Sequence, residues 1–172
     1  MCPASPETAL VAFFRRHSLV APLIDCDGLI ERHGLVLAMG FAMREAEFRA
    51  QPDIAGGARF GNRHFAERDI LAAAGEAHRL AAKLDNIAER QPVPCPLSAF
   101  GATIDAMALA MRRLDEAGCF VTPSALLREG FTAAEIIEAG PEATTLAEAM
   151  ALAIRRYHKA RRDTAEALRE AA

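Results

Sequence analysis

Residues 62–90 read NRHFAERDILAAAGEAHRLAAKLDNIAER, and this stretch decides the fold. Its apolar residues recur at alternating three- and four-residue steps, which is the spacing of one face of an α-helix. The members of this apolar stripe are Ile70, Ala73, Ala77, Leu80, Leu84 and Ile87. Charged residues fill the opposite side, so the stripe has to be buried against other helices. We predict a helix that is capped by Asn62 and runs to Arg90.

The composition favours helix over sheet throughout the chain. Of the 172 residues, 52% are hydrophobic, and the sequence has one Tyr and no Trp. Alanine is a strong helix former, whereas the aromatic and β-branched residues that strands prefer are scarce. We therefore expect residues 1–172 to form a single helical domain, an irregular all-α bundle of four to five main helices.

Two helices are predicted before the central stretch. Ser5 caps the first, and Pro22 ends it near residue 20. The second begins at a cap on Asp27 and runs to about Arg49. Glycines interrupt this second helix, so the sequence leaves open whether Gly34 or Gly40 breaks it or admits a close neighbour.

Two segments are predicted to be non-helical. Residues 51–61 read QPDIAGGARFG, and their proline and paired glycines indicate a loop. Residues 91–96 hold three prolines in five positions, which favours a stiff, extended connection. That connection is either a link between two antiparallel helices or a domain boundary, and we expect the former. No strand is predicted.

The C-terminal half is predicted to contain four helices. One spans Ser98 to about Gly118, and a short one spans Thr122–Glu129. Thr132 caps another to Ala139, Gly140-Pro141 breaks the chain, and the last helix covers 142–170. The short helix, turn and short helix at 122–140 have the outline of a helix-turn-helix.

That outline suggests an alternative function, a DNA-binding transcriptional regulator that uses residues 122–162. Either possible recognition helix begins with acidic residues, Glu135 and Glu138 in one register and Glu142 in the other. Such side chains repel the phosphate backbone. We therefore expect a structural helix hairpin rather than a DNA-reading element.

A basic cluster near the C-terminus is the candidate surface for nucleic acid or a protein partner. Its members are Arg155, Arg156, Lys159, Arg161 and Arg162. Residues 151–172 carry six bases and three acids, a net charge of +3, whereas residues 97–150 carry three bases and eight acids, a net charge of −5. The simplest interpretation is that both segments are solvated faces; the alternative is that the cluster pairs with the acidic segment, within one chain or across a homodimer, and we expect such pairing rather than nucleic-acid binding.

The candidate metal ligands are His64 and Glu67. They lie three residues apart on the predicted helix, a spacing that carboxylate-bridged iron bundles use, but no second pair accompanies them. A helical bundle that binds a metal or a small ligand is the second alternative. No nucleophile motif, phosphate loop or zinc motif occurs, so an enzyme is not favoured and no cofactor is predicted.

The remaining features indicate a reduced, soluble, cytoplasmic protein without a membrane partner. Cys2, Cys26, Cys95 and Cys119 fit no zinc spacing, and we expect them to act as small core residues. The longest apolar run, 34–43, is about half of a membrane span. The function that we predict is a non-enzymatic helical interaction protein that associates with itself.

Overall fold

The computed structural model describes residues 5–19, 26–52, 56–91 and 98–170, with the backbone alone for residues 26–31. It is 76% helical, which confirms the all-α prediction. The helices are α1 (Pro6–Arg16), α2 (Cys26–Glu45), α3 (Glu67–Ala88), α4 (Ser98–Glu116), α5 (Pro123–Arg128) and α6 (Ala133–Glu170). No helix in these described ranges combines the length and apolarity needed to cross a bilayer. The proline-rich residues 92–97 lie outside the described part.

The chain divides into two compact units, each built from separated segments. The first, here the α4 unit, comprises Met1–Ser18 and Lys83–Ala151, and the second, here the sheet unit, comprises Leu19–Ala82 and Leu152–Ala172. Helices α3 and α6 contribute residues to both units. The expectation of a single domain stays a prediction.

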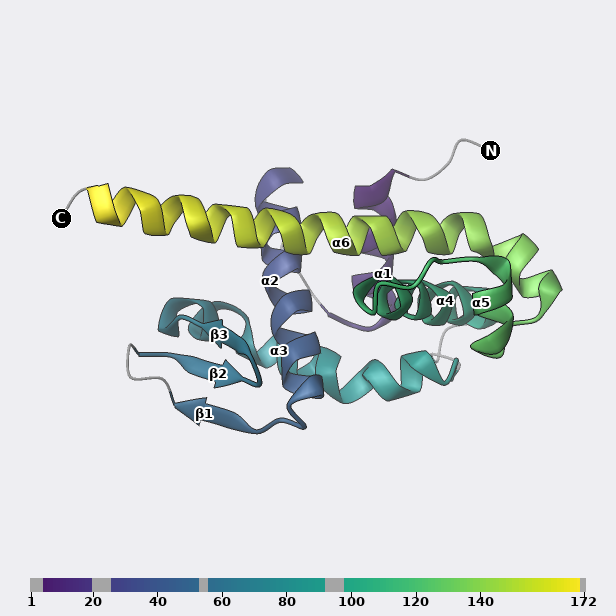
Figure 1. Cartoon of the computed structure of the whole chain (residues 1–172), viewed down its shortest axis with the longest axis horizontal. Coiled ribbons are helices and arrows are strands. Elements are labelled where there is room, and N and C mark those ends of the chain that lie inside the picture. Colours follow the sequence, from purple (N-terminus) through teal and green to yellow (C-terminus); the bar gives the residue numbers. More distant parts are fainter. Residues whose placement is uncertain (1–4, 20–25, 53–55, 92–97, 171–172) are drawn as a thin grey trace. The chain divides into compact units, whose positions relative to one another are not determined.

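A small antiparallel sheet replaces the loop expected at residues 51–61. Its strands are β1 (Ala50–Pro52), β2 (Ala58–Phe60) and β3 (Arg63–Phe65), with β2 in the middle (Figure 1). Gly61 has a φ of +55° and, with Asn62, forms the two-residue turn that joins Phe60 to Arg63. A glycine in the first position of such a loop favours a tight hairpin. The predictions of a loop and of no strand were therefore wrong.

The helix centred on the apolar stripe is present but starts later than predicted. α3 begins at Glu67, so Asn62 belongs to the hairpin turn and is not its cap. Of the six stripe residues, Ile70 is half-buried and the other five are buried. The periodicity thus identified the buried face correctly, whereas the start of the helix was set by the sheet that precedes it.

α2 is continuous through both glycines, which resolves the open alternative. A Cβ atom on Gly34 would lie 2.1 Å from the carbonyl oxygen of Ala153 on α6, inside any allowed contact. Gly34 therefore serves close helix approach rather than a break. The helix ends at Glu45 instead of Arg49, because Glu47 and Phe48 adopt positive φ values of 48° and 61°.

α6 runs without interruption past Gly140-Pro141, where a break was predicted. Pro141 lies inside the helix. It removes the N–H that would bond to the carbonyl four residues earlier, at Ile137. The Ile137 side chain is 77% exposed, so water can reach that part of the helix. The prediction of a separate short helix at 132–139 was therefore wrong. The predicted cap at Thr132 is present, because Thr132 and Glu135 form reciprocal hydrogen bonds between backbone N–H and side-chain oxygen, which is a capping box.

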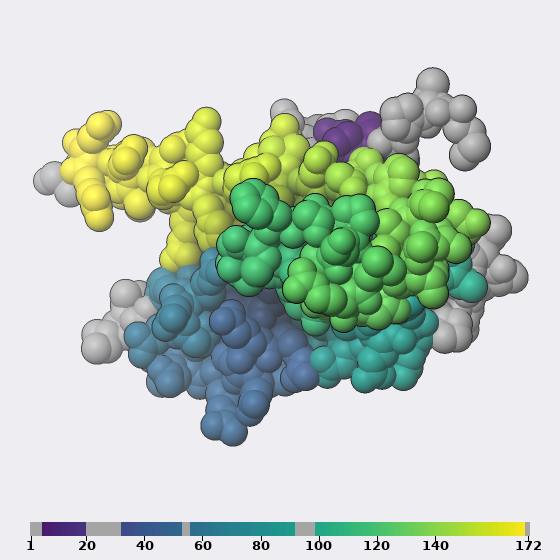
Figure 2. Space-filling view, turned by 45° about the vertical axis from the view of Figure 1, so that its right-hand side comes forward, coloured from purple at the N-terminus to yellow at the C-terminus, as the bar shows by residue number. Residues whose placement is uncertain are grey.

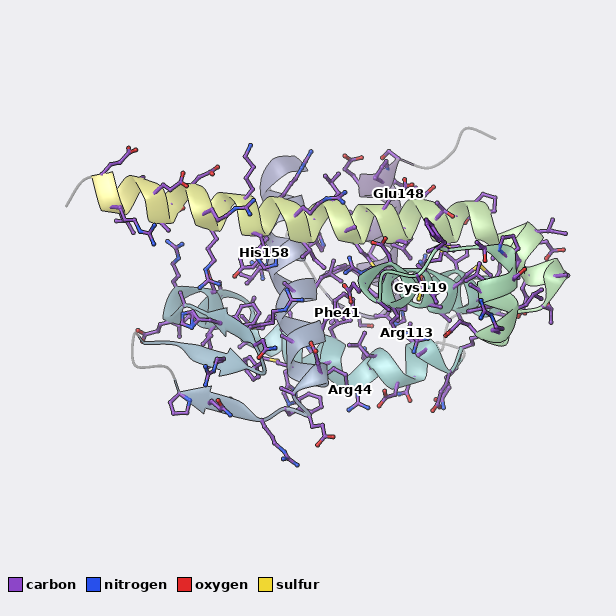
Figure 3. The ribbon with its side chains drawn as sticks, viewed as in Figure 1. Phe41, Arg44, Arg113, Cys119, Glu148 and His158 are labelled. Atoms are coloured by element: carbon purple, nitrogen blue, oxygen red, sulfur yellow. The ribbon has the colours of Figure 1, made fainter. Side chains whose placement is uncertain are left out.

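The end of α1 and the exposure of the Cys119 side chain also differ from the predictions. α1 starts after Ser5, which caps it as predicted. The helix ends at Arg16 instead of near residue 20, because Ser18 has a φ of +54°. Cys119, which lies between α4 and α5 and is labelled in Figure 3, is exposed and is not a core residue. Leu168, near the C-terminal end of α6, is an apolar residue that is 68% exposed.

α4 is the buried centre of its own unit. From Gly101 to Met111, every residue except Thr103 is buried. Asp105 in this run is fully buried, and its carboxylate accepts hydrogen bonds from Arg16 and His17 of the α1 end, with 2.9 Å from Arg16 Nε to Oδ2. A buried carboxylate is costly unless it is paired in this way.

We predict that Gly34→Ala destabilises the protein, whereas Gly75→Ala stabilises it. A methyl group at position 34 would overlap the Ala153 carbonyl, while a methyl group at position 75 has no atom within 4 Å to meet. The first change should lower the free energy of unfolding by about 2 kcal/mol or more, and the second should raise it by up to ~1 kcal/mol. Urea denaturation followed by circular dichroism measures both. Equal effects of the two substitutions would contradict the close approach.

Candidate functional site

The sheet unit contains a pocket between α2, α3 and α6. Its volume is about 470 Å³, within the range of small-molecule sites. Its polar lining residues are Arg32, Arg68, Asp69, Tyr157, Arg161 and Thr164. Leu35, Ala72 and Ala160 supply the apolar part of the wall.

Helical spacing explains how each helix delivers its lining residues. Tyr157, Arg161 and Thr164 are four and three residues apart, so they lie along one face of α6. Arg32 and Leu35 are likewise three apart on α2. The pocket is therefore formed by the facing sides of three regular helices, which hold side chains more rigidly than loops do.

Tyr157 and Asp69 form the buried hydrogen bond of the pocket. The Tyr157 hydroxyl donates to Asp69 Oδ2 over 3.1 Å, and the two residues are 6% and 8% exposed. Burial, followed by the negative charge of Asp69, raises the pKa of Tyr157 to about 12. The phenol therefore stays protonated at neutral pH and remains a hydrogen-bond donor.

Three arginines give the pocket an excess of positive charge. Arg32 forms an ion pair with Glu76 at 3.0 Å, and its Nε atom is buried without a hydrogen-bond partner among the described residues. Arg68 Nε lies 3.7 Å from Asp69 Oδ1, and Arg161 donates to the backbone oxygen of His64. Three arginines thus line the pocket together with one carboxylate, Asp69, and Glu76 offsets the charge of Arg32.

The residue after Tyr157 adds to this positive field only weakly. His158, labelled in Figure 3, has a lowered pKa, because burial and the nearby charges of Arg63, Arg161 and Arg162 all disfavour its cationic form. The imidazole is therefore neutral at pH 7, and the permanent charges around it belong to arginines.

The structure separates the five residues of the predicted basic cluster. Arg161 lines the pocket and is partly buried, whereas Arg155, Arg156, Lys159 and Arg162 are exposed on α6. Figure 2 shows the following C-terminal turns of α6, in yellow, with residues 165–170 all exposed. Only one member of the cluster therefore belongs to the pocket.

The pair predicted as metal ligands does not share a helix face. His64 lies on β3 and Glu67 is the first residue of α3, so the helical spacing on which the hypothesis depended is absent. In the described ranges, no three His, Cys, Asp or Glu side chains converge where they could hold a metal ion.

Sequence reasoning missed most of the pocket. Arg32, Asp69 and Tyr157 are far apart in the chain, and Asp69 was assigned to the solvated face of its helix. One signal was available for Asp69: it directly precedes Ile70, so it borders the apolar stripe. The hairpin also had a signal, the Gly-Asn pair between two Phe-containing segments.

Comparison with known proteins gives no relative for this pocket. No family model, curated protein or solved structure matches the chain. The chemistry of the site is therefore argued from its geometry and charges.

We predict that the tyrosine absorbance of the folded protein titrates with a midpoint near pH 12 instead of 10, as the raised pKa of Tyr157 requires. Tyr157 is the single tyrosine of a chain without Trp, so the signal reports this residue alone. Asp69→Asn should lower the midpoint, because it removes a negative charge that opposes ionisation.

The same shift makes stability depend on pH. Tyr157 ionises at a lower pH in the unfolded chain than in the folded chain. The contribution of the protonated phenol to the free energy of unfolding is therefore intact below pH 10 and is lost as the pH rises toward 12. Over this range the free energy of unfolding should fall by roughly 2 kcal/mol because of Tyr157. The Tyr157→Phe variant, which has no phenol to ionise, should not show this fall. Circular dichroism at each pH identifies the folded state, and a folded-state midpoint at pH 10 would contradict the buried Tyr157–Asp69 bond.

Proposed function

We propose that the protein binds a small organic anion in the pocket between α2, α3 and α6. The observation that carries this proposal is the convergence of Arg32, Arg68 and Arg161 on one cavity of about 470 Å³ with a single carboxylate in its lining. An anion there would offset the excess charge. This function belongs to the class of small-ligand-binding helical proteins.

Arginine is suited to this task because its planar guanidinium binds carboxylate and phosphate oxygens with two parallel hydrogen bonds. Arg68 has space to reorient, since 65% of its side chain is exposed. Arg161 is better fixed, because the backbone oxygen of His64 already holds one of its terminal nitrogens. Together they combine a pre-positioned donor with an adaptable one.

The apolar wall supports an organic ligand rather than a bare ion. Leu35 is buried, and Ala72 and Ala160 are small residues that leave room beside it. Contacts of this kind favour a carbon skeleton, while the arginines orient its acidic group. The volume exceeds what one phosphate or carboxylate group fills.

We predict that Arg161→Gln weakens the binding of sn-glycerol 3-phosphate tenfold or more, whereas Arg155→Gln weakens it little. Both substitutions remove one positive charge from α6, but Arg155 is exposed and outside the pocket lining. Loss of a charge-assisted hydrogen bond accounts for a tenfold change. Isothermal titration calorimetry measures the affinity, and Tyr157 fluorescence reports binding at the pocket.

Circular dichroism checks that both variants remain folded. Equal losses in the two variants would indicate a general charge effect and would contradict a specific site. If neither glycerol phosphate nor citrate nor inorganic phosphate binds the full chain, the proposed function is wrong.

A second candidate function, self-association, is favoured by exposed apolar side chains of the α4 unit. Phe120 is 89% exposed and Ile137 is 77% exposed, with Val121 and Leu127 also exposed. All four lie within eighteen residues, 120–137, of the chain. We propose that these side chains are covered by a second copy of the protein, since several exposed large apolar side chains in one short segment favour an interaction surface.

We predict a concentration-dependent dimer that the double substitution Phe120→Ser and Ile137→Ser weakens. Leu71→Ser is the matched control, because Leu71 is 81% exposed in the sheet unit and lies outside residues 120–137. Size-exclusion chromatography with light scattering measures the mass. A monomer at high micromolar concentration would remove this second candidate.

DNA reading through residues 122–162 receives less support than either proposal. The helix that follows Gly130 is continuous over Ala133–Glu170 and begins with Glu135 in its first turn. Hydrogen bonds from Thr132 lower the pKa of Glu135, so this end stays negatively charged at neutral pH. A negative helix start disfavours the phosphate contacts that a recognition helix needs.

A further inference from the structure

One oxygen of the Asp69 carboxylate accepts a hydrogen bond, whereas the other forms an ion pair without one. Oδ2 accepts the hydrogen bond from Tyr157, whereas Oδ1 accepts none of the hydrogen bonds formed within the described residues. The nearest cation to Oδ1 is Arg68 Nε at 3.7 Å, which is beyond hydrogen-bond distance. Asp69 is 8% exposed and lines the pocket, and Oδ1 is not one of the fully buried atoms that lack a hydrogen-bond partner in the described residues, so Oδ1 is an acceptor that remains accessible from the cavity.

A carboxylate oxygen that is accessible from a cavity can bond to solvent there, and a ligand that displaces this solvent has to replace the lost donor. An ionised carboxylate only accepts hydrogen bonds, so a ligand in the pocket must present an O–H or an N–H group at this position. The acidic groups of the same ligand cannot do so, because they are acceptors and are repelled by Asp69. The ligand therefore needs a second kind of polar group, distinct from the one that the arginines bind.

The charges of the pocket decide between a hydroxyl and an ammonium group. An ammonium would be attracted by Asp69 but repelled by Arg68 and Arg161, which line the same cavity, whereas Glu76 offsets the charge of Arg32. A hydroxyl group is neutral and donates to Oδ1 without that repulsion. The arrangement consequently favours an uncharged donor.

We infer that the ligand is a hydroxylated anion, such as a sugar phosphate or a hydroxy acid, whose acidic group binds the arginines and whose hydroxyl donates to Asp69. This inference rests on the proposed function, because it assigns the chemical class of the anion. Tyr157 acts as a positioning residue: its hydrogen bond fixes the carboxylate so that Oδ1 remains available.

The test compares ligands that differ only in the proposed group. In the unmodified full chain, sn-glycerol 3-phosphate should bind about tenfold or more tightly than n-propyl phosphate, which has the same carbon chain without hydroxyls. O-Phosphoethanolamine, which carries an ammonium group, should bind more weakly than glycerol phosphate. Calorimetry gives the affinities, and the fluorescence of Tyr157 checks that each ligand binds at the pocket.

Asp69→Asn then assigns the preference to this carboxylate. The substitution keeps the side-chain shape but removes the charge that strengthens the hydrogen bond, so the tenfold preference should fall to roughly threefold or less. Arg155→Gln, the exposed control on α6, should leave the preference intact.

The outcomes separate this inference from the proposed function. If none of the three phosphates binds, the anion pocket itself is wrong. If glycerol phosphate and propyl phosphate bind equally, the pocket stands and the hydroxyl contact is wrong. Tightest binding of O-phosphoethanolamine would also overturn the inference, because Asp69 would then be an ammonium site. A preference that survives Asp69→Asn unchanged would assign the hydroxyl to another residue and contradict the proposal.

Discussion

The close approach of α2 and α6 at Gly34 is the constraint on which the sheet unit depends. No side chain fits between Gly34 and the carbonyl oxygen of Ala153, so the two helices touch through their backbones. Residues that line the pocket lie beside this contact: Arg32 and Leu35 are two and one residues from Gly34 on α2, and Tyr157 is one turn after Ala153 on α6. The glycine thus sets the separation at which arginines from different helices share one cavity.

Two buried aspartates, Asp105 and Asp69, illustrate two solutions to the same physical problem. In the α4 unit, both oxygens of Asp105 are occupied by Arg16 and His17, so this carboxylate serves packing of α1 against α4. In the sheet unit, Tyr157 occupies one oxygen of Asp69 and the other adjoins a cavity. Burial alone therefore does not identify a binding residue, whereas burial with an available oxygen beside a cavity points to one.

The sequence predicted the structure best where no tertiary interaction opposes the local pattern. The three- and four-residue steps of α3 predicted its buried face, and Ser5 and Thr132 predicted helix starts, because these signals act over a single turn. Prediction failed where local rules compete with packing. Asn62 can cap a helix or complete a hairpin turn, and pairing with β2 decides for the turn. Pro141 disfavours helix locally, yet α6 continues through it.

The sequence by itself determined that the chain is helical, which face of α3 is buried, and that its C-terminal segment is basic, since each property depends on residues within a few turns of one another. Only the tertiary structure decided that Arg161 is separated from the other basic residues and joins Arg32 and Asp69 around a pocket. Those three residues lie far apart in the chain. Their meeting depends on how helices pack, and the pattern of any one helix does not encode that arrangement.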